Sequence, residues 1–461
     1  MSEVSLGFRP YLDGYYDASL QLQMHVYRRS EALFQHFDRL KDAIDTPEKA
    51  LAWQAQVRRQ SLATFGGLPD EQTPLEPERL GTVHGAGFDI EKIIFQSMPR
   101  VYVTANLYLL RDLNRPTGTV LFVCGHSEQA KVWPEYQAVC QRMVRNGLVV
   151  LAIDPFGQGE RKSYLDERGR EIVKWGPVEH TFAGFQCWWL GQSSARYFVH
   201  DARRAIDYLV SRPEVDPSRI GMTGNSGGAT QTAWTMLVED RLAAAAPATF
   251  ITRRRDYLWT GRPQDAEQHL LGGTSVGIDH EDCLIALAPK PVLVLAADSD
   301  YFNVEGTVAA VERARQFYRL LGKPDNVRLV RASGTHAYHP ALAMAATAFF
   351  VKHLLDGDPR SVDHREPELL DPDALLCTPS GQVLVDRPET RRIFDLNLAE
   401  YQKRPTRPPD PALRVEMALG WLKETIYRHR RPGTLYPRWL PGPEIDGGQV
   451  RHGLWWSEVD V

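Results

Sequence analysis

The spacing of apolar side chains changes along the chain, beginning with a helical pattern. Residues 19–41 and the segment after Pro47 carry apolar side chains three and four positions apart. This spacing predicts two amphipathic helices, and Gly66-Gly67 is expected to end the second. We therefore expect a helical N-terminal segment over residues 1–79.

From residue 80 the pattern becomes that of strands. Alternating apolar positions over 81–110 predict antiparallel strands with a turn at 97–100. The continuous apolar runs 120–124 and 148–153 enclose a helical segment and are typical of strands buried on both faces of a parallel sheet. Strands and helices continue to alternate up to about residue 356. This alternation predicts an α/β fold with a doubly wound sheet over residues 80–356.

Two segments of this α/β region lack clear periodicity, and the chain then continues beyond it. Residues 162–194 and 252–283 contain several tryptophans, and we expect both to be lid-like excursions over the edge of the sheet where such folds carry their sites. Residues 357–461 form a C-terminal extension. Within it, 375–385 has the pattern of a hairpin with a Pro-Ser-Gly turn, and 412–428 that of a helix.

Composition and charge limit the classes of partner. The chain has 461 residues, 43% hydrophobic and 24% charged, with a formal net charge of −4. That balance gives no basic surface for nucleic acid. No apolar run approaches the roughly 18 residues of a membrane span, and the N-terminal residues lack the basic and apolar regions of a leader. We therefore expect a cytoplasmic protein that binds a small molecule, with no nucleic acid or membrane partner; homo-oligomer formation is left open.

Cysteine and histidine spacing gives no metal motif. The five cysteines are scattered, odd in number and without Cys-x-x-Cys spacing, so neither a disulfide framework nor a zinc site is indicated. Histidines outside the motifs described below also lack i, i+4 or cysteine-paired spacing. This holds for His25, His36, His84, His180, His200, His269 and His280. The sequence thus predicts no metal and no cofactor.

The strongest chemical signal is Gly224-Asn225-Ser226-Gly227-Gly228, which follows a short apolar run and precedes a helical segment. A Gly-x-Ser-x-Gly sequence where a strand turns into a helix is typical of a nucleophile elbow. The glycines are needed because the turn imposes an unfavourable backbone angle on the serine and leaves no room for neighbouring Cβ atoms. We predict Ser226 as a nucleophile and the Gly227 amide as an oxyanion donor. The alternative is a Gly/Ser turn without chemical importance.

A serine nucleophile needs a base, and the base needs an acid to fix its tautomer. On such a sheet both follow the serine, in the order Ser, Asp/Glu, His, on loops after later strands. The next-to-last expected strand is followed by Asp298 and Asp300, and the last by His336 and His339. We predict Asp300 as the acid and His336 as the base, with Asp298 and His339 as the alternatives.

The remaining site residues are expected on neighbouring loops. A second oxyanion amide should come from the loop after the first buried parallel strand, from the backbone of His126 or Ser127. The His126 imidazole would otherwise only line the pocket. Aromatic side chains in the excursions and beside the acid are candidates for stacking on a substrate, with core packing as the alternative. The predicted substrate-binding residues are Trp189, Trp259, Tyr301 and Phe302.

Taken together, these motifs resemble those of acetyl xylan esterase-like and dienelactone hydrolase-like α/β-hydrolases over roughly residues 80–355. The residues that carry the resemblance are Gly125-His126-Ser127, Asp154-Pro155-Phe156-Gly157-Gln158-Gly159-Glu160-Arg161, 219–228, Asp300-Tyr301-Phe302 and His336. Two positions depart from the family pattern: Asn303 stands where proline is frequent, and Ala130 where glycine is common. The resemblance implies an α/β-hydrolase sheet and a carboxyl-ester hydrolase that uses Ser226, Asp300 and His336.

The functional expectation is a serine carboxylesterase. It would remove small acyl groups, acetyl among them, from a sugar-like alcohol through an acyl-enzyme. Two alternatives remain open from the sequence. One is a serine peptidase of the oligopeptidase kind, and the other is a non-catalytic α/β-hydrolase module in which the elbow serves packing.

Overall fold

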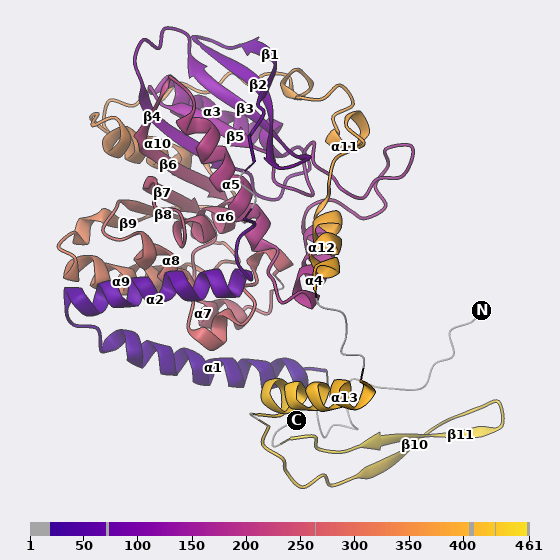
Figure 1. Ribbon diagram of the computed structural model, residues 1–461. Coiled ribbons are helices and arrows are strands. Elements are labelled where there is room, and N and C mark those ends of the chain that lie inside the picture. Colours follow the sequence, from indigo (N-terminus) through magenta and orange to yellow (C-terminus); the bar gives the residue numbers. More distant parts are fainter. Residues whose placement is uncertain (1–18, 71–72, 263, 405–409, 429, 459–461) are drawn as a thin grey trace. The chain divides into compact units, whose positions relative to one another are not determined.

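The computed structural model describes residues 19–70, 73–262, 264–404, 410–428 and 430–458 (Figure 1). Two compact units can be separated by their internal contacts. The larger is Phe37–Gln402, and the smaller combines the described parts of Met1–His36 and Lys403–Val461. The division expected from the sequence, at residues 79 and 356, stays a prediction. Along the described residues, no helix combines the length and apolar character needed to cross a bilayer.

The N-terminal helical pattern is confirmed by α1 (Gln21–Asp42) and α2 (Pro47–Phe65). The Thr46 side chain caps α2 by accepting a hydrogen bond from the Lys49 amide. Gly66 ends it with a φ of 74°, a left-handed conformation that favours glycine.

A mixed sheet of nine strands forms the centre of the larger unit, in the order β1-β2-β3-β5-β4-β6-β7-β8-β9. The first three strands pair antiparallel, as the alternating pattern predicted: β1 (Glu78–His84), β2 (Phe88–Met98) and β3 (Val101–Leu110). The other six pair parallel with one another: β4 (Thr117–Val123), β5 (Val149–Ile153), β6 (Val215–Asn225), β7 (Leu242–Ala248), β8 (Val292–Ala297) and β9 (Val327–Ala332).

Helices cover both faces of this sheet and bury a core on each (Figure 1). One core takes residues from α3 (Pro134–Arg145) and α10 (Pro340–Leu354). The other takes residues from α2 and from four further helices: α5 (Ala195–Val210), α6 (Gly227–Met236), α8 (His280–Leu287) and α9 (Val304–Leu320). The doubly wound α/β fold predicted from the sequence is confirmed.

The two excursions contain more regular structure than the sequence indicated. The first holds α4 (Pro177–Trp189). Periodicity did not reveal it because α4 buries Glu179 and His180 while exposing Phe182 and Phe185, which reverses the usual pattern. The second holds three short elements: α7 (Arg254–Leu258), η2 (Ala266–Gln268) and η3 (Gly273–Val276).

The predicted hairpin at 375–385 is wrong. This stretch contains the end of η5 (Pro372–Leu375) and most of α11 (Val383–Asp386). Its first residues bond to Glu160 and not across a hairpin: the amides of Cys377 and Thr378 donate to the Glu160 carboxylate at 2.8 and 2.7 Å, and the Val383 amide donates to the Glu160 carbonyl oxygen at 2.8 Å. Because the Glu160 side chain accepts hydrogen bonds from the amides of Cys377 and Thr378, they do not need a strand partner.

Further along the C-terminal extension, the structure has α12 (Ile393–Gln402). The helix predicted at 412–428 is confirmed as α13 (Pro411–Trp421), continued by the π-helical turn η6 (Leu422–Tyr427). A two-stranded sheet of β10 (Arg438–Ile445) and β11 (Gly448–Leu454) follows in the smaller unit.

A buried ion cluster joins residues 377–378 to the loops that follow β4 and β5. The Lys131 ammonium, fully buried, lies 2.7 Å from Asp154 and also contacts Glu160. Burial lowers the pKa of Lys131, but the two carboxylates raise it well above its ordinary value. The loops after β4 and β5 and residues 377–378 are therefore held by one charged side chain.

We predict that Lys131→Met destabilises the protein by about 3–5 kcal/mol, because it leaves two buried carboxylates without a cation. Lys49→Met is the matched control, since Lys49 pairs with Asp45 in solvent, and it should change the free energy of unfolding by less than about 1 kcal/mol. Urea unfolding of both variants measures the difference. Equal stabilities would contradict this account of the cluster.

Candidate functional site

Ser226 occupies a strained turn between β6 and α6. Its φ is 56° and its ψ −118°, which is unusual for a residue with a side chain. A Cβ at Gly224 would lie 2.3 Å from the Val123 carbonyl oxygen, and one at Gly228 only 2.1 Å from it. Both positions therefore require glycine, as the sequence predicted.

Asp300 and His336 are brought together by the loops after β8 and β9. His336 Nδ1 lies 2.9 and 3.0 Å from the two carboxylate oxygens of Asp300. Asp298 instead contacts Arg331 at 2.7 Å, and His339 Nε2 lies 2.6 Å from the Thr335 carbonyl oxygen. Of the two acids and two histidines considered from the sequence, the structure pairs Asp300 with His336.

Because His336 Nδ1 faces a carboxylate, it carries the proton, and Nε2 is left to accept one. The Tyr301 hydroxyl lies 3.0 Å from this Nε2. The Ser226 side chain also interacts with the Tyr301 phenol and lowers its pKa, although burial outweighs this effect and raises the pKa to about 12. Tyr301 thus links the serine to the imidazole.

The other aromatic candidates lie in different surroundings. Phe302 is 2% exposed and packs on Tyr257 and Phe250, with ring centroids 5.0 and 5.3 Å away. It belongs to the core behind His336. Trp189, at the end of α4, and Trp259, after α7, are 84% and 56% exposed. Their contact with a substrate stays a prediction.

The loop after β4 approaches the elbow closely. A Cβ at Gly125 would lie 2.2 Å from the Asn225 carbonyl oxygen. Ser127 follows and is buried, and its carbonyl oxygen accepts a hydrogen bond from the Ala130 amide at 3.1 Å. The predicted oxyanion loop is therefore beside Ser226, while the choice between the amides of His126 and Ser127 stays open.

A second group of polar side chains adjoins the elbow, and no sequence motif predicted it. We call His126, His180, Asp265 and Glu267 the His–carboxylate cluster; one nitrogen or oxygen of each lies within 4.8 Å of the others. His126 follows β4, His180 is on α4, and the two acids lie at η2. No local spacing could reveal it, because three separate segments supply its members.

The cluster touches the elbow helix itself. A Cβ at Gly227 would lie 2.6 Å from Glu267 Oε1 and 3.1 Å from His126 Cε1. The predicted oxyanion residue Gly227 therefore lies against the cluster, and the His126 imidazole points into the cluster.

Burial and charge oppose each other within the cluster. Burial lowers the pKa of His126, but the carboxylates of Glu267 and Asp265 raise it to about 10. Burial likewise raises the pKa of Asp265, and contact with His126 and His180 brings it below its ordinary value. No described residue donates a well-aligned hydrogen bond to any of the four carboxylate oxygens of Asp265 and Glu267. The group could therefore hold a metal ion.

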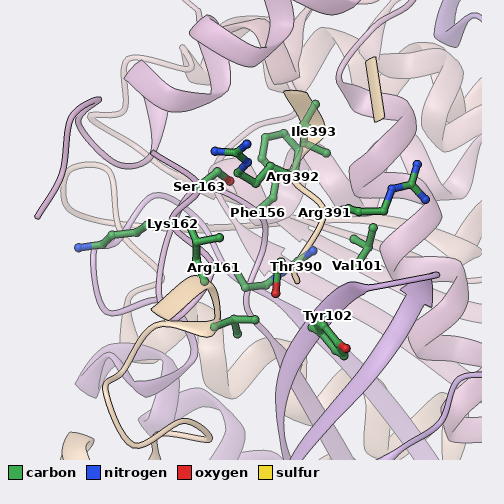
Figure 2. Close-up of a pocket in the computed structure, with 12 residues that line it drawn as sticks. Val101, Tyr102, Phe156, Arg161, Lys162, Ser163, Thr390, Arg391, Arg392 and Ile393 are labelled. Atoms are coloured by element: carbon green, nitrogen blue, oxygen red, sulfur yellow. The ribbon is translucent and has the colours of Figure 1, made fainter. Parts of the chain in front are cut away.

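A crevice near the C-terminal extension, drawn in Figure 2, is not a ligand site of ordinary size. Its volume is about 30 Å³, whereas pockets for small molecules span roughly 300–1,000 Å³. Phe156 and Arg161 line it together with Arg391 and Arg392 from the extension. We interpret it as a packing gap with room for water.

Comparison of the sequence with known proteins finds a distant relative but no family. No family model matches the chain. Over 316 residues it is 23% identical to "Putative hydrolase YtaP" of Bacillus subtilis (strain 168), covering 65% of this chain and 100% of that protein. That identity is too low to assign the chain to a family.

Solved structures are similar at the level of the fold. Methylesterase BT1017 has a TM-score of 0.62 and 18% identity, over 84% of this chain and 81% of that one. A "putative acetyl xylan esterase" of Bacteroides fragilis NCTC 9343 has a TM-score of 0.51 and 18% identity, over 62% of this chain and 76% of that one. A CE15 glucuronoyl esterase from Teredinibacter turnerae T7901 has a TM-score of 0.50 and 14% identity, over 67% of this chain and 86% of that one. The α/β-hydrolase fold that the motifs implied is confirmed.

The strain at Ser226 gives a prediction about stability. We expect Ser226→Gly to be more stable than Ser226→Ala by about 1 kcal/mol, because glycine adopts a φ of 56° at little cost and alanine does not. Both changes remove the hydroxyl, so the comparison isolates the backbone. Urea unfolding of the two variants measures it, and a more stable alanine variant would mean that the turn is unstrained.

Proposed function

We propose that this protein is a serine carboxylesterase in which Ser226 is the nucleophile, His336 the base and Asp300 the acid that orients it. The observation that carries the proposal is that a strained elbow serine and a His336–Asp300 pair share one neighbour, Tyr301. The Tyr301 hydroxyl contacts His336, and its phenol interacts with the Ser226 side chain. An activated serine of this kind is suited to acyl transfer.

The geometry supports a two-step reaction. Ser226 Oγ attacks the ester carbonyl carbon while its proton passes to His336 Nε2, and Asp300 stabilises the imidazolium through Nδ1–H. Collapse of the tetrahedral intermediate breaks the C–O bond, and His336 returns the proton to the departing alcohol. Water then attacks the acyl-enzyme by the same route. The Gly227 amide and one amide of the loop after β4 would bind the oxyanion.

Tyr301 has to give way in this sequence, because its hydroxyl contacts the Nε2 that receives the proton. Ser226 is 5% exposed and Tyr301 38% exposed, so the tyrosine is the more accessible of the two. We propose that an entering ester takes over the contacts of the tyrosine hydroxyl.

The substrate class we propose is a small acyl ester, such as an acetyl ester, of a sugar-like alcohol. Support comes from the fold shared with proteins named as an acetyl xylan esterase and a glucuronoyl esterase, together with the exposed indoles of Trp189 and Trp259 in the two excursions. Flat indole faces can stack on the apolar face of a sugar ring.

A cytoplasmic location is also part of the proposal. All five cysteines are buried and free, which fits the reduced thiols of a cytoplasm.

The triad is tested with para-nitrophenyl acetate. We expect Ser226→Ala to lower kcat by roughly 10⁴-fold or more, because no other group supplies the nucleophile. Asp300→Asn should lower kcat by roughly 10⁴-fold, because it disturbs the tautomer of His336. Thermal melts of each variant show whether the protein remains folded.

The chain offers matched controls for both roles. Asp298→Asn and His339→Gln change the neighbouring acid and histidine, which contact Arg331 and Thr335 instead of the serine. Both should keep the activity of the wild type. Full activity of a folded Ser226→Ala protein would refute the proposal, and loss of activity in Asp298→Asn with retention in Asp300→Asn would reassign the acid.

A further inference from the structure

We infer that the His–carboxylate cluster of His126, His180, Asp265 and Glu267 binds a divalent transition-metal ion, with Zn²⁺ as the best match. The ion would lie directly beside the elbow and join both excursions to the loop after β4. This inference does not depend on esterase activity, because it rests on the geometry of the four side chains.

Five of the six pairs of groups in the cluster are 3.0–3.5 Å apart, near the separation of ligands on one metal ion, and all four ligand atoms lie within 4.8 Å of one another. His126 Nε2 lies 3.0 Å from Asp265 Oδ2, 3.2 Å from Glu267 Oε1 and 3.2 Å from His180 Nδ1. His180 Nδ1 is 3.5 Å from an oxygen of each carboxylate. Tetrahedral zinc with bonds of about 2.0–2.2 Å separates its ligands by about 3.4 Å.

His180 is oriented as metal-binding histidines are. Its Nε2 lies 2.8 Å from the Phe156 carbonyl oxygen and donates to it, so the lone pair of Nδ1 faces the two carboxylates. A ligating imidazole characteristically uses its other nitrogen in this way, which fixes both ring and tautomer. With the side chain 1% exposed, no solvent competes for Nδ1.

The charges of the cluster also call for a dication. Asp265 and Glu267 are 5% and 1% exposed, and within the described part of the chain nothing donates a well-aligned hydrogen bond to their four oxygens. Buried carboxylates are normally paired or bound to metal. One proton on His126 would cancel only one of the two negative charges, whereas a divalent ion with two neutral imidazoles cancels both.

The ligand types favour zinc over the hard cations. Imidazole nitrogens suit Zn²⁺ and its transition-metal neighbours, while Mg²⁺ and Ca²⁺ prefer six or more oxygens. Four protein ligands make a closed site, which is typical of a structural ion. The ion therefore acts by positioning the residues around the elbow.

The backbone around the cluster is built to hold these ligands in place. Gly184 lies one turn beyond His180 on α4, and a Cβ there would come 2.1 Å from the Cβ of Ala266 on η2. The Glu267 carbonyl oxygen accepts a hydrogen bond from Trp234 Nε1 of α6 at 3.0 Å. The two excursions thus already touch each other and the elbow helix at the ligand positions.

The direct test is the metal content and zinc affinity of the full-length protein. We expect about one equivalent of zinc per chain after purification without chelator, and a rise in melting temperature when ZnCl₂ is returned to chelator-treated protein. Co²⁺ in place of zinc should give the visible absorption of a tetrahedral site. These readouts use the unmutated chain and need no substrate.

Variants then assign the binding to the cluster. Glu267→Gln and His180→Asn should weaken zinc binding by about 100-fold or more, because each removes a ligand. His84→Asn is the matched control, since His84 forms a histidine–aspartate pair with Asp89 at the surface, and it should bind zinc as the wild type does.

Wild-type protein that takes up no divalent metal, gains no thermal stability from zinc and shows no cobalt absorption would overturn the inference. Undiminished zinc binding by both folded ligand variants would overturn it as well. The two proposals can fail separately. A protein that binds zinc but hydrolyses no ester would refute the esterase proposal alone, and a protein that hydrolyses ester but binds no zinc would refute the metal site alone.

Discussion

The structure depends on the close approach of backbone at the end of β4, where the elbow packs. The Val123 carbonyl oxygen lies where a Cβ at Gly224 or Gly228 would be, and the Asn225 carbonyl oxygen where a Cβ at Gly125 would be. These contacts bring two loops and the N-terminus of α6 to one point at the carboxyl edge of the sheet. Each group of the site is arranged around that point, and Ser226 is held in its strained turn there.

Segments added to the sheet are attached by buried charge as well as by apolar packing. Lys131 joins the loops after β4 and β5 to the C-terminal extension through Glu160. Lys41 likewise lies 2.7 and 2.6 Å from Glu281 and Asp282 of α8, which attaches the last turn of α1 to the core of the larger unit. Removing one partner from such a group leaves an uncompensated buried charge. The His–carboxylate cluster does the same for the two excursions, where we infer that a metal ion takes the place of lysine.

Local patterns in the sequence were enough to predict the sheet and the elbow. Continuous apolar runs identify the buried parallel strands, and the glycines around Ser226 identify the turn, because both reflect short-range constraints. The sequence also limited the acid and base to two candidates each. Of these candidates the sequence favoured Asp300 and His336, and in the structure Asp298 and His339 have other partners.

What the sequence did not predict depends on contacts between distant segments. α4 buries polar residues toward the cluster, so its periodicity is inverted. The 375–385 stretch reads as a hairpin because its backbone partner, Glu160, lies more than 200 positions earlier in the chain. Local spacing does not reveal the His–carboxylate cluster for the same reason, since its four residues come from three segments. Such groups become visible only after the chain is folded.

The claim at the centre of this account is that Ser226 Oγ is an activated nucleophile. Its most direct measurement is mass spectrometry of the protein after reaction with a fluorophosphonate, which forms a covalent bond with activated serines. The account predicts one adduct per chain, on the peptide that contains Ser226, and its loss in the His336→Gln variant. A folded protein that forms no adduct, or forms it on another residue, would contradict the account.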